Sequence, residues 1–131
     1  MRMTTLALTT ASLGVLAIAT PMISTASAHA IIELKGVSAV AGTTTAMTLE
    51  IQHGCLPSEP TVQVEAFVGA PWRSLKPQTV EGWTSTVARQ SGGGWHVTWV
   101  KHGDPVPFGT ATFFPITVAW PKTAGTYGMS V

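Results

Sequence analysis

Apolar and polar residues alternate with a period of two along most of the chain after residue 28. In the segment MTLEIQ, Met47, Leu49 and Ile51 fall on one side and polar residues on the other. The segments TVQVEAFV and GWHVTWV repeat the pattern, and the residues predicted to face the core there are Val62, Val64, Ala66, Val68, Trp95, Val97 and Trp99. Such alternation is typical of strands with one buried face, whereas helical periodicity is absent.

Turn-forming residues separate these alternating segments. GCLPSEP, SGGG and HGDPVPFG are rich in the Gly, Pro, Ser and Asp residues that reverse a chain. Short strands divided by such turns predict an all-β fold, an antiparallel β-sandwich or barrel.

A hairpin is predicted between residues 30–34 and the MTLEIQ segment, with Ala30, Ile32 and Leu34 facing the core. If the chain reverses near Ala39 and Val40, antiparallel pairing sets His29 opposite Glu50 and Ala30 opposite Leu49. A shift of two residues in this register would move His29 opposite Thr48 or Gln52. Glu50 would then be a diagonal neighbour, still within reach of a long side chain.

Residues 1–28 have the features of a cleaved signal peptide. Arg2 supplies a positive start, residues 6–19 are mostly apolar, and Ala26, Ser27 and Ala28 form a small-x-small cleavage site. A membrane anchor is disfavoured because Thr and Ser interrupt the apolar run, which falls short of the roughly 20 residues a span needs. We therefore expect export to the periplasm, cell surface or medium, and a single mature domain over residues 29–131.

Charge argues against several classes of partner. Apart from Arg2, basic and acidic residues are equal in number, so no overall field draws the chain to nucleic acid or anionic lipid. Cys55 is the only cysteine of the chain, which is unusual in an exported protein. Its open interpretations are a buried small side chain, an intermolecular partner, a soft metal ligand, and half of a disulfide bridge.

Cleavage after Ala28 would make His29 the first residue, with a free α-amine and an imidazole Nδ1 that can chelate one metal ion. Copper(II) fits this donor set best, because it prefers nitrogen ligands in a tetragonal plane and leads the divalent affinity order. A carboxylate from Glu50 would add a third donor. Glu33 is the first substitute for Glu50, and His53 is the next. A solvated terminus without metal is the alternative for His29.

The remaining histidines and aromatic residues receive weaker assignments. We expect His96 and His102 to be solvated, and His53 with Cys55 forms an H-x-C pair that is a weak metal signal. The tryptophans at positions 72, 83 and 120 are expected to pack in the core and at its rim rather than to form a sugar platform.

The order of these features resembles the YcnI-type family of bacterial exported copper-binding domains. The resemblance rests on a signal peptide, His29 at the cleavage point, AG before a strand, HGC at its end, TVQVEAFV, GW at Gly82 and Trp83, GGWHVTWV, FFPITVAWP and a final AG. It covers nearly all of residues 29–131.

The resemblance implies an immunoglobulin-like or cupredoxin-like β-sandwich that binds copper(II) through a mono-histidine brace, here His29 with a glutamate. It also implies a role beside other periplasmic copper carriers. Members of the family continue through a further strand with a Gly and a Trp near the metal, and often a second cysteine; no such residues follow Val131 in this sequence.

Three functions are compared on these grounds. The first is a non-enzymatic copper-binding protein of copper homeostasis or trafficking. The second is a metal-free secreted sandwich that binds a protein or glycan through exposed tryptophans, Trp72 among them, and Phe67. The third, a copper oxidase or monooxygenase, would need a second histidine, for which only His53 is a candidate. No Ser-His-Asp order, phosphate loop or paired-carboxylate cleft supports other catalysis.

Overall fold

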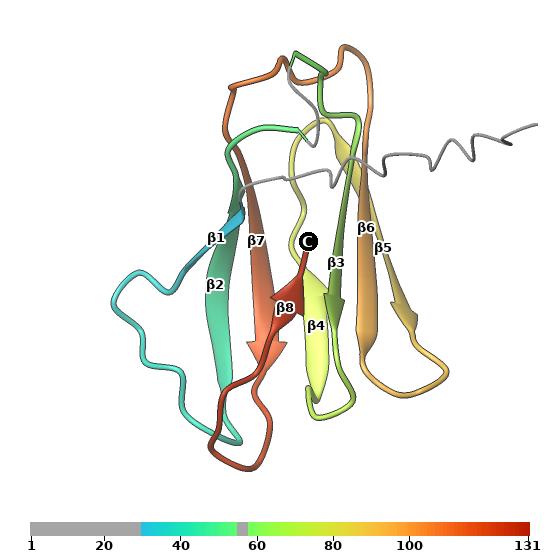
Figure 1. Ribbon diagram of the computed structural model, residues 1–131. Helices are drawn as coiled ribbons and strands as arrows, with labels where there is room; N and C mark the ends of the chain where they lie inside the picture. Colours follow the sequence, from blue (N-terminus) through green and yellow to red (C-terminus); the bar gives the residue numbers. More distant parts are fainter. Residues whose placement is uncertain (1–29, 55–57) are drawn as a thin grey trace, which may run out of the picture.

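The computed structural model describes residues 30–54 and 58–131, and these residues form strands and connections without a helix (Figure 1). The prediction of an all-β fold is therefore confirmed. The strands are β1 (Ala30–Glu33), β2 (Thr44–Ile51), β3 (Gln63–Val68), β4 (Ser74–Pro77), β5 (Trp83–Arg89), β6 (Trp95–Lys101), β7 (Thr112–Ala119) and β8 (Met129–Ser130).

The strands form two separate antiparallel sheets. The first sheet has the order β1-β2-β7-β4 and the second has the order β5-β6-β3-β8. Chain neighbours such as β2 and β3, or β4 and β5, belong to different sheets, so the chain crosses between the layers several times, and Figure 1 shows the connections at the ends of the strands. The architecture is thus a β-sandwich and not a closed barrel.

The core lies between the inner faces of the two sheets. Leu49 of β2, Trp99 of β6 and Phe114 of β7 are fully buried. The Phe114 ring meets Trp83 edge-on, with centroids 4.9 Å apart, and lies tilted against Trp99 at the same centroid separation. Such geometry suits the quadrupoles of aromatic rings and adds to the free energy of burial.

The predicted inner faces of the three alternating segments are confirmed, with two exceptions at their ends. Every second residue of β2 and β3 is buried, as are Val97 and Trp99 in the middle of β6, as the alternation requires. Val62, however, is 53% exposed because β3 begins only at Gln63. Trp95 is half-buried at the start of β6, where its indole nitrogen donates to the carbonyl of Trp72 at 3.2 Å.

The first strand was predicted to be more deeply buried than it is. Ala30 and Ile32 pair with the inward-facing Ile51 and Leu49, so the predicted side is correct. Ile32 is nevertheless 44% exposed and Ala30 is exposed as well. The reason is that β1 forms the edge of the first sheet: within residues 30–54 and 58–131, no strand pairs with its other side. Leu34, just beyond β1, packs partly against the core.

Candidate functional site

Glu50 lies on the outer face of the first sheet. Its neighbours along β2, Leu49 and Ile51, point into the core, so alternation directs the Glu50 side chain outward, where it is half-buried. Directly opposite it are Ile31 on β1 and Phe113 on β7, and both of these apolar side chains are exposed. Glu50 is therefore a carboxylate flanked by two apolar neighbours on a surface that solvent reaches.

The register predicted first for this hairpin is wrong, and the observed pairing is one of the alternatives shifted by two residues. Ala30 pairs with Ile51 instead of Leu49, and Ile31 is the residue opposite Glu50. The connection over residues 34–43 explains the difference, because it is not a symmetric tight turn. It contains one turn at Val37, whose amide donates to Leu34, and another at Thr43, whose amide donates to Val40.

Among the described residues, few polar side chains lie near the Glu50 carboxylate. Gln52 donates from its side-chain amide to a Glu50 carboxylate oxygen at 3.4 Å. Glu33 pairs with Thr48, which makes it a diagonal neighbour of Glu50 on the same face. Within residues 30–54 and 58–131, no three His, Cys, Asp or Glu side chains are grouped closely enough to hold a metal ion. A copper site at Glu50 therefore needs donors from outside these ranges, and His29, the predicted ligand, lies outside the described residues.

His53, the second predicted substitute for Glu50 as a copper ligand, lies just beyond the end of β2. Its ring nitrogen Nδ1 is 2.8 Å from the carbonyl oxygen of Gly54 and therefore donates to it. The ring also lies against Phe108, with centroids 5.2 Å apart. These contacts engage both the Nδ1 atom and the ring face of the imidazole. Cys55, the other half of the H-x-C pair, lies outside the described residues.

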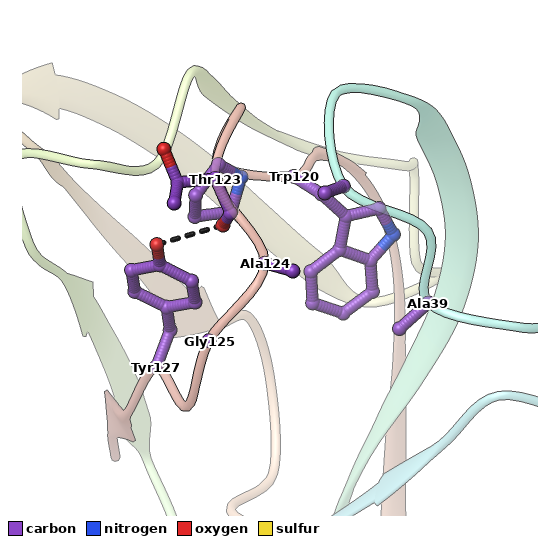
Figure 2. A pocket seen from close by; sticks show the side chains of 8 residues that line it. Ala39, Trp120, Thr123, Ala124, Gly125 and Tyr127 are labelled. Atoms are coloured by element: carbon purple, nitrogen blue, oxygen red, sulfur yellow. Dashed lines mark hydrogen bonds between the residues drawn. The ribbon is translucent and has the colours of Figure 1, made fainter.

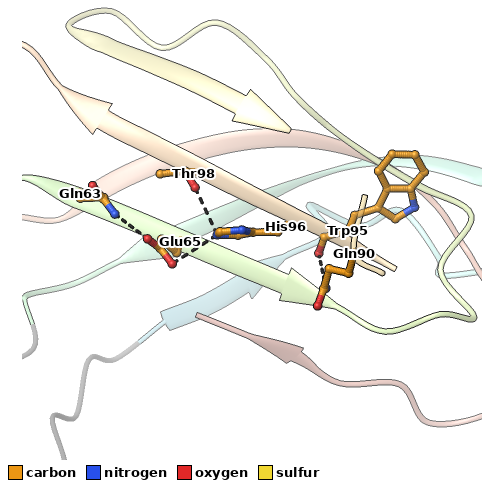
Figure 3. A network of polar contacts seen from close by, with 6 residues as sticks. All are labelled: Gln63, Glu65, Gln90, Trp95, His96 and Thr98. Atoms are coloured by element: carbon orange, nitrogen blue, oxygen red, sulfur yellow. Dashed lines mark hydrogen bonds and ion pairs between the residues drawn. The ribbon is translucent and has the colours of Figure 1, made fainter. Parts of the chain in front are cut away.

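His96 is more constrained than the sequence suggested. Its Nε2 atom lies 3.3 Å from a carboxylate oxygen of Glu65 on the neighbouring strand β3 and 3.2 Å from the hydroxyl of Thr98 (Figure 3). The imidazole is also stacked on Phe67, with ring centroids 4.1 Å apart and planes 14° from parallel. The expectation of a merely solvated side chain is wrong here, because pairing of β3 with β6 puts Phe67 directly opposite His96.

His102 is exposed, as expected, and its Nε2 atom is hydrogen-bonded to the Thr84 hydroxyl. Lys101 donates to the His102 carbonyl oxygen at 2.6 Å. Neither contact brings a second ionisable ligand to the imidazole, so His102 offers no site of its own.

The tryptophans pack as predicted, and this removes one basis for the partner-binding alternative. Trp72 is only 4% exposed and Trp83 only 9%, so neither forms an accessible platform. Trp120 is half-buried, lies tilted against Trp72 with centroids 5.1 Å apart, and donates to the Thr45 hydroxyl at 2.9 Å. The proposed role of Trp72 in partner binding is therefore wrong, whereas Phe67 is 36% exposed.

A hollow of about 220 Å³ lies beside Trp120. Figure 2 shows Ala124 between Trp120 and Tyr127, Gly125 near Tyr127, and Ala39 on the other side of Trp120. The Tyr127 hydroxyl donates to the Thr123 carbonyl at 2.8 Å, so its polar atom is already engaged within the loop. Apart from Tyr127, the described lining residues carry no ionisable side chain, so the hollow has few groups that could orient a bound molecule.

Over residues 30–54 and 58–131, no helix is long and apolar enough to cross a bilayer. A search of family models found no match, and no curated protein matches either. Among solved structures, the chain is similar to an uncharacterized protein from Nocardia farcinica whose crystal structure reveals an immunoglobulin-like fold. The two share 20% identity with a TM-score of 0.52, over 78% of this chain and 73% of the other. The likeness concerns the fold alone: this chain is an immunoglobulin-like β-sandwich.

Proposed function

We propose that this protein is an exported, non-enzymatic copper(II)-binding protein of copper homeostasis or trafficking. In this proposal, cleavage after Ala28 exposes His29, whose α-amine and imidazole bind the ion. Glu50 supplies a carboxylate, and the ion is the cargo of the protein rather than a catalytic group. The observation that carries the proposal is the position of Glu50 on the outer face of β2, directly opposite Ile31.

The hairpin geometry limits where the donors can meet. The proposal requires His29, which lies outside the described residues, to reach the outer face that Ile31 and Glu50 share, as a diagonal neighbour of Glu50. Diagonal neighbours on one face of an antiparallel pair are about 7–8 Å apart at their Cα atoms, a span that an imidazole and a glutamate can bridge through a shared ion. The corrected register is therefore compatible with a His29–Glu50 site.

Charge and chemistry also favour this donor set. Two nitrogens from one residue close a chelate ring, and a carboxylate offsets part of the charge of the divalent ion. The α-amine must lose its proton before it binds copper, and an ordinary α-amine does so at about pH 8. Copper affinity should therefore rise as the pH increases toward this value. Glu33 remains the alternative carboxylate, since it lies on the same face and diagonal to Glu50. His53 is the less favoured alternative because Gly54 and Phe108 already engage its ring.

The proposal is tested first on the exported protein. Mass spectrometry should show a chain that starts at His29. Copper(II) titration followed by electron paramagnetic resonance should then show one bound ion with nitrogen couplings. An added alanine before His29 moves the α-amine away from the imidazole and should abolish that spectrum. Unchanged copper binding by the extended chain would refute the brace.

The carboxylate is assigned by two matched substitutions. Glu50→Gln and Glu33→Gln each remove one negative charge from the same face while preserving side-chain size. We expect Glu50→Gln to weaken copper binding and to alter the spectrum, and Glu33→Gln to leave both near those of the unmodified chain. The reverse result would reassign the carboxylate to Glu33, and equal binding by both variants and the unmodified chain would remove the carboxylate from the proposal.

A further inference from the structure

The strand β5 forms one edge of the second sheet. It pairs with β6 on one side, and within residues 30–54 and 58–131 no strand pairs with its other side (Figure 1). From Trp83 to Arg89 it keeps a constant register with β6, so no bulge interrupts the strand. Its middle consists mainly of Thr, Ser and Val, with no proline. β5 is therefore a regular edge along which another strand can pair.

The described edges of the first sheet are built differently. β1 and β4 have four residues each, and β4 contains Lys76 and ends at Pro77. Short edge strands, lysine and proline are features by which proteins prevent pairing between sheet edges. β5 has seven residues and contains neither lysine nor proline. Of the edges β1, β4 and β5, the last is therefore the one suited to pair with another strand.

The backbone groups that face the open edge of β5 can be assigned from one contact. The His102 amide donates to the Gly82 carbonyl at 2.8 Å, across the β5–β6 pair. The hydrogen-bonding direction alternates along an antiparallel strand, so the even-numbered residues of β5 bond toward β6. Ser85, Val87 and Arg89 therefore direct their backbone N–H and C=O groups to the open edge. Groups of this kind are a template for a further strand.

Val87 leaves apolar surface at this edge. Alternation puts its side chain on the same side of β5 as that of Trp83, which is buried. Val87 is nevertheless 42% exposed, because no strand of the described residues pairs beyond β5. A strand paired along the edge would remove part of this surface from water, which favours association.

Opposite charges stand at the two ends of the same edge. Glu81 precedes β5 by two positions, and Arg89 is the last residue of β5. Both side chains are exposed, and within the part of the chain that the structure describes neither forms an ion pair. The guanidinium of Arg89 lies 5.1 Å from the ring centroid of Trp95, a contact that holds the positive charge at this end. A second β5 running antiparallel to the first presents the two charges in the reverse order, so the edge is complementary to itself.

We propose that β5 is the interface of a homodimer, in which the β5 strands of two copies of this chain pair antiparallel about a two-fold axis. The axis passes beside Thr86, so that all seven residues of one strand overlap all seven of the other. Thr86 then lies opposite its own copy, and Ser85 lies opposite Val87 of the other copy. Glu81 is a diagonal neighbour of Arg89 of the other copy, within reach of these long side chains.

This arrangement joins the second sheets of the two copies into one continuous sheet. A two-fold contact uses each β5 edge once, so the assembly closes at two copies and does not continue as a fibre. Main-chain hydrogen bonds and burial of Val87 supply affinity, whereas the exposed charge pairs mainly select the antiparallel register. The inference stands apart from the copper proposal, since it uses the other sheet and requires no metal.

The first test is sedimentation equilibrium of the exported protein without metal, over a range of concentrations. We expect a reversible monomer–dimer equilibrium, and a chain that remains monomeric up to about 1 mM would overturn the proposal. Val87→Lys puts like charges diagonally across the axis and should raise the dissociation constant at least about tenfold. Val100→Lys is the matched control, since Val100 is also 42% exposed but lies on β6, which is paired on both sides. Equal losses in the two variants, or no loss in Val87→Lys, would also overturn the proposal.

Reversal of the two charges tests the antiparallel pairing. Glu81→Arg or Arg89→Glu alone brings like charges together at both ends of the interface and should weaken the dimer about tenfold. The double variant restores opposite charges in the reverse order and should recover most of the affinity. A double variant that binds no better than the single variants would refute the pairing.

Disulfide cross-linking tests the position of the axis. In a chain that carries Cys55→Ser, Thr86→Cys should form a covalent dimer, because directly opposite residues of a non-hydrogen-bonded pair have Cα atoms about 4.5 Å apart. Thr98→Cys, opposite Thr86 on β6, is the control and should remain monomeric. Cross-linking of both variants to the same extent would indicate random collision and contradict the proposal.

Amide exchange distinguishes a second copy from any other occupant of the edge. The Ser85 and Val87 amides should exchange fast in dilute protein and more slowly as the protein concentration rises. The Thr84 and Ala88 amides, bonded to β6, should be protected at every concentration and serve as internal references. Protection of Ser85 and Val87 in the dilute monomer would mean that another segment of the same chain covers the edge, and the proposal would be wrong.

Discussion

The connection between β5 and β6 provides a sharp test of the packing described above. Gly94 has φ of +86°, and a Cβ atom built on it would lie 2.1 Å from the backbone carbonyl oxygen of Val68. Gly93 has a similar φ of +85°, but the nearest atom to its Cβ would be the methyl carbon of Ala70, at 2.9 Å. Gly92 has no positive φ and no atom within 4 Å of that position. Alanine at these three positions should therefore have graded effects.

The magnitudes follow from two contributions. A left-handed conformation costs a non-glycine residue about 1–2 kcal/mol, which applies to Gly93→Ala and Gly94→Ala alike. In Gly94→Ala the clash with a main-chain oxygen must also be relieved by moving backbone, which threatens the bond that Gln90 donates to the Val68 carbonyl at 3.2 Å. Losing that bond adds about 1 kcal/mol, and the displaced packing brings the total to about 3–4 kcal/mol. Gly92→Ala should be neutral or stabilise by about 0.5 kcal/mol, because it restricts only the unfolded chain.

Urea unfolding followed by tryptophan fluorescence measures these differences, since Trp72, Trp83 and Trp99 are all buried. The free energy of unfolding should fall with urea concentration at the same slope in the three variants. The differences in stability should then appear as shifts of the unfolding midpoint. If the free energies of unfolding of Gly94→Ala and Gly92→Ala differ by less than about 1 kcal/mol, the close approach between this turn and the end of β3 does not exist as described.

Three further predictions concern other parts of the sandwich. Trp120→Phe should cost about 1–2 kcal/mol in urea unfolding, because it removes the donor to the buried Thr45 hydroxyl; an unchanged midpoint would contradict that bond. Leu49→Ala should cost about 2–5 kcal/mol, since Leu49 is fully buried, whereas Val37→Ala, at a side chain 52% exposed, should stay within about 0.5 kcal/mol; similar losses in both would contradict the assigned core. If the copper proposal holds, bound copper should slow amide exchange between β1 and β2 more than within β6; uniform slowing would indicate a general effect instead.

The fold class and the inner faces of the long strands were predictable because both depend on local alternation. Burial of one face of a strand imposes a period of two, and Leu49, Val97 and their neighbours follow it. The packing of Trp72 was predicted from its large aromatic side chain alone, because it lies in the connection between β3 and β4, where no periodic pattern marks the inner side. The contact between Glu65 and His96 was missed for a related reason: it requires knowing that β3 pairs with β6, which are separated along the chain by two other strands.

The hairpin register shows where local reasoning stops. Alternation fixes which face a residue occupies, but it is satisfied equally by every shift of two residues. The choice among those shifts is made by the connecting segment, and here residues 34–43 contain two separate turns, one of them with Gly36 at φ of +81°. The face of Glu50 was therefore predictable, whereas its partner on β1 was not.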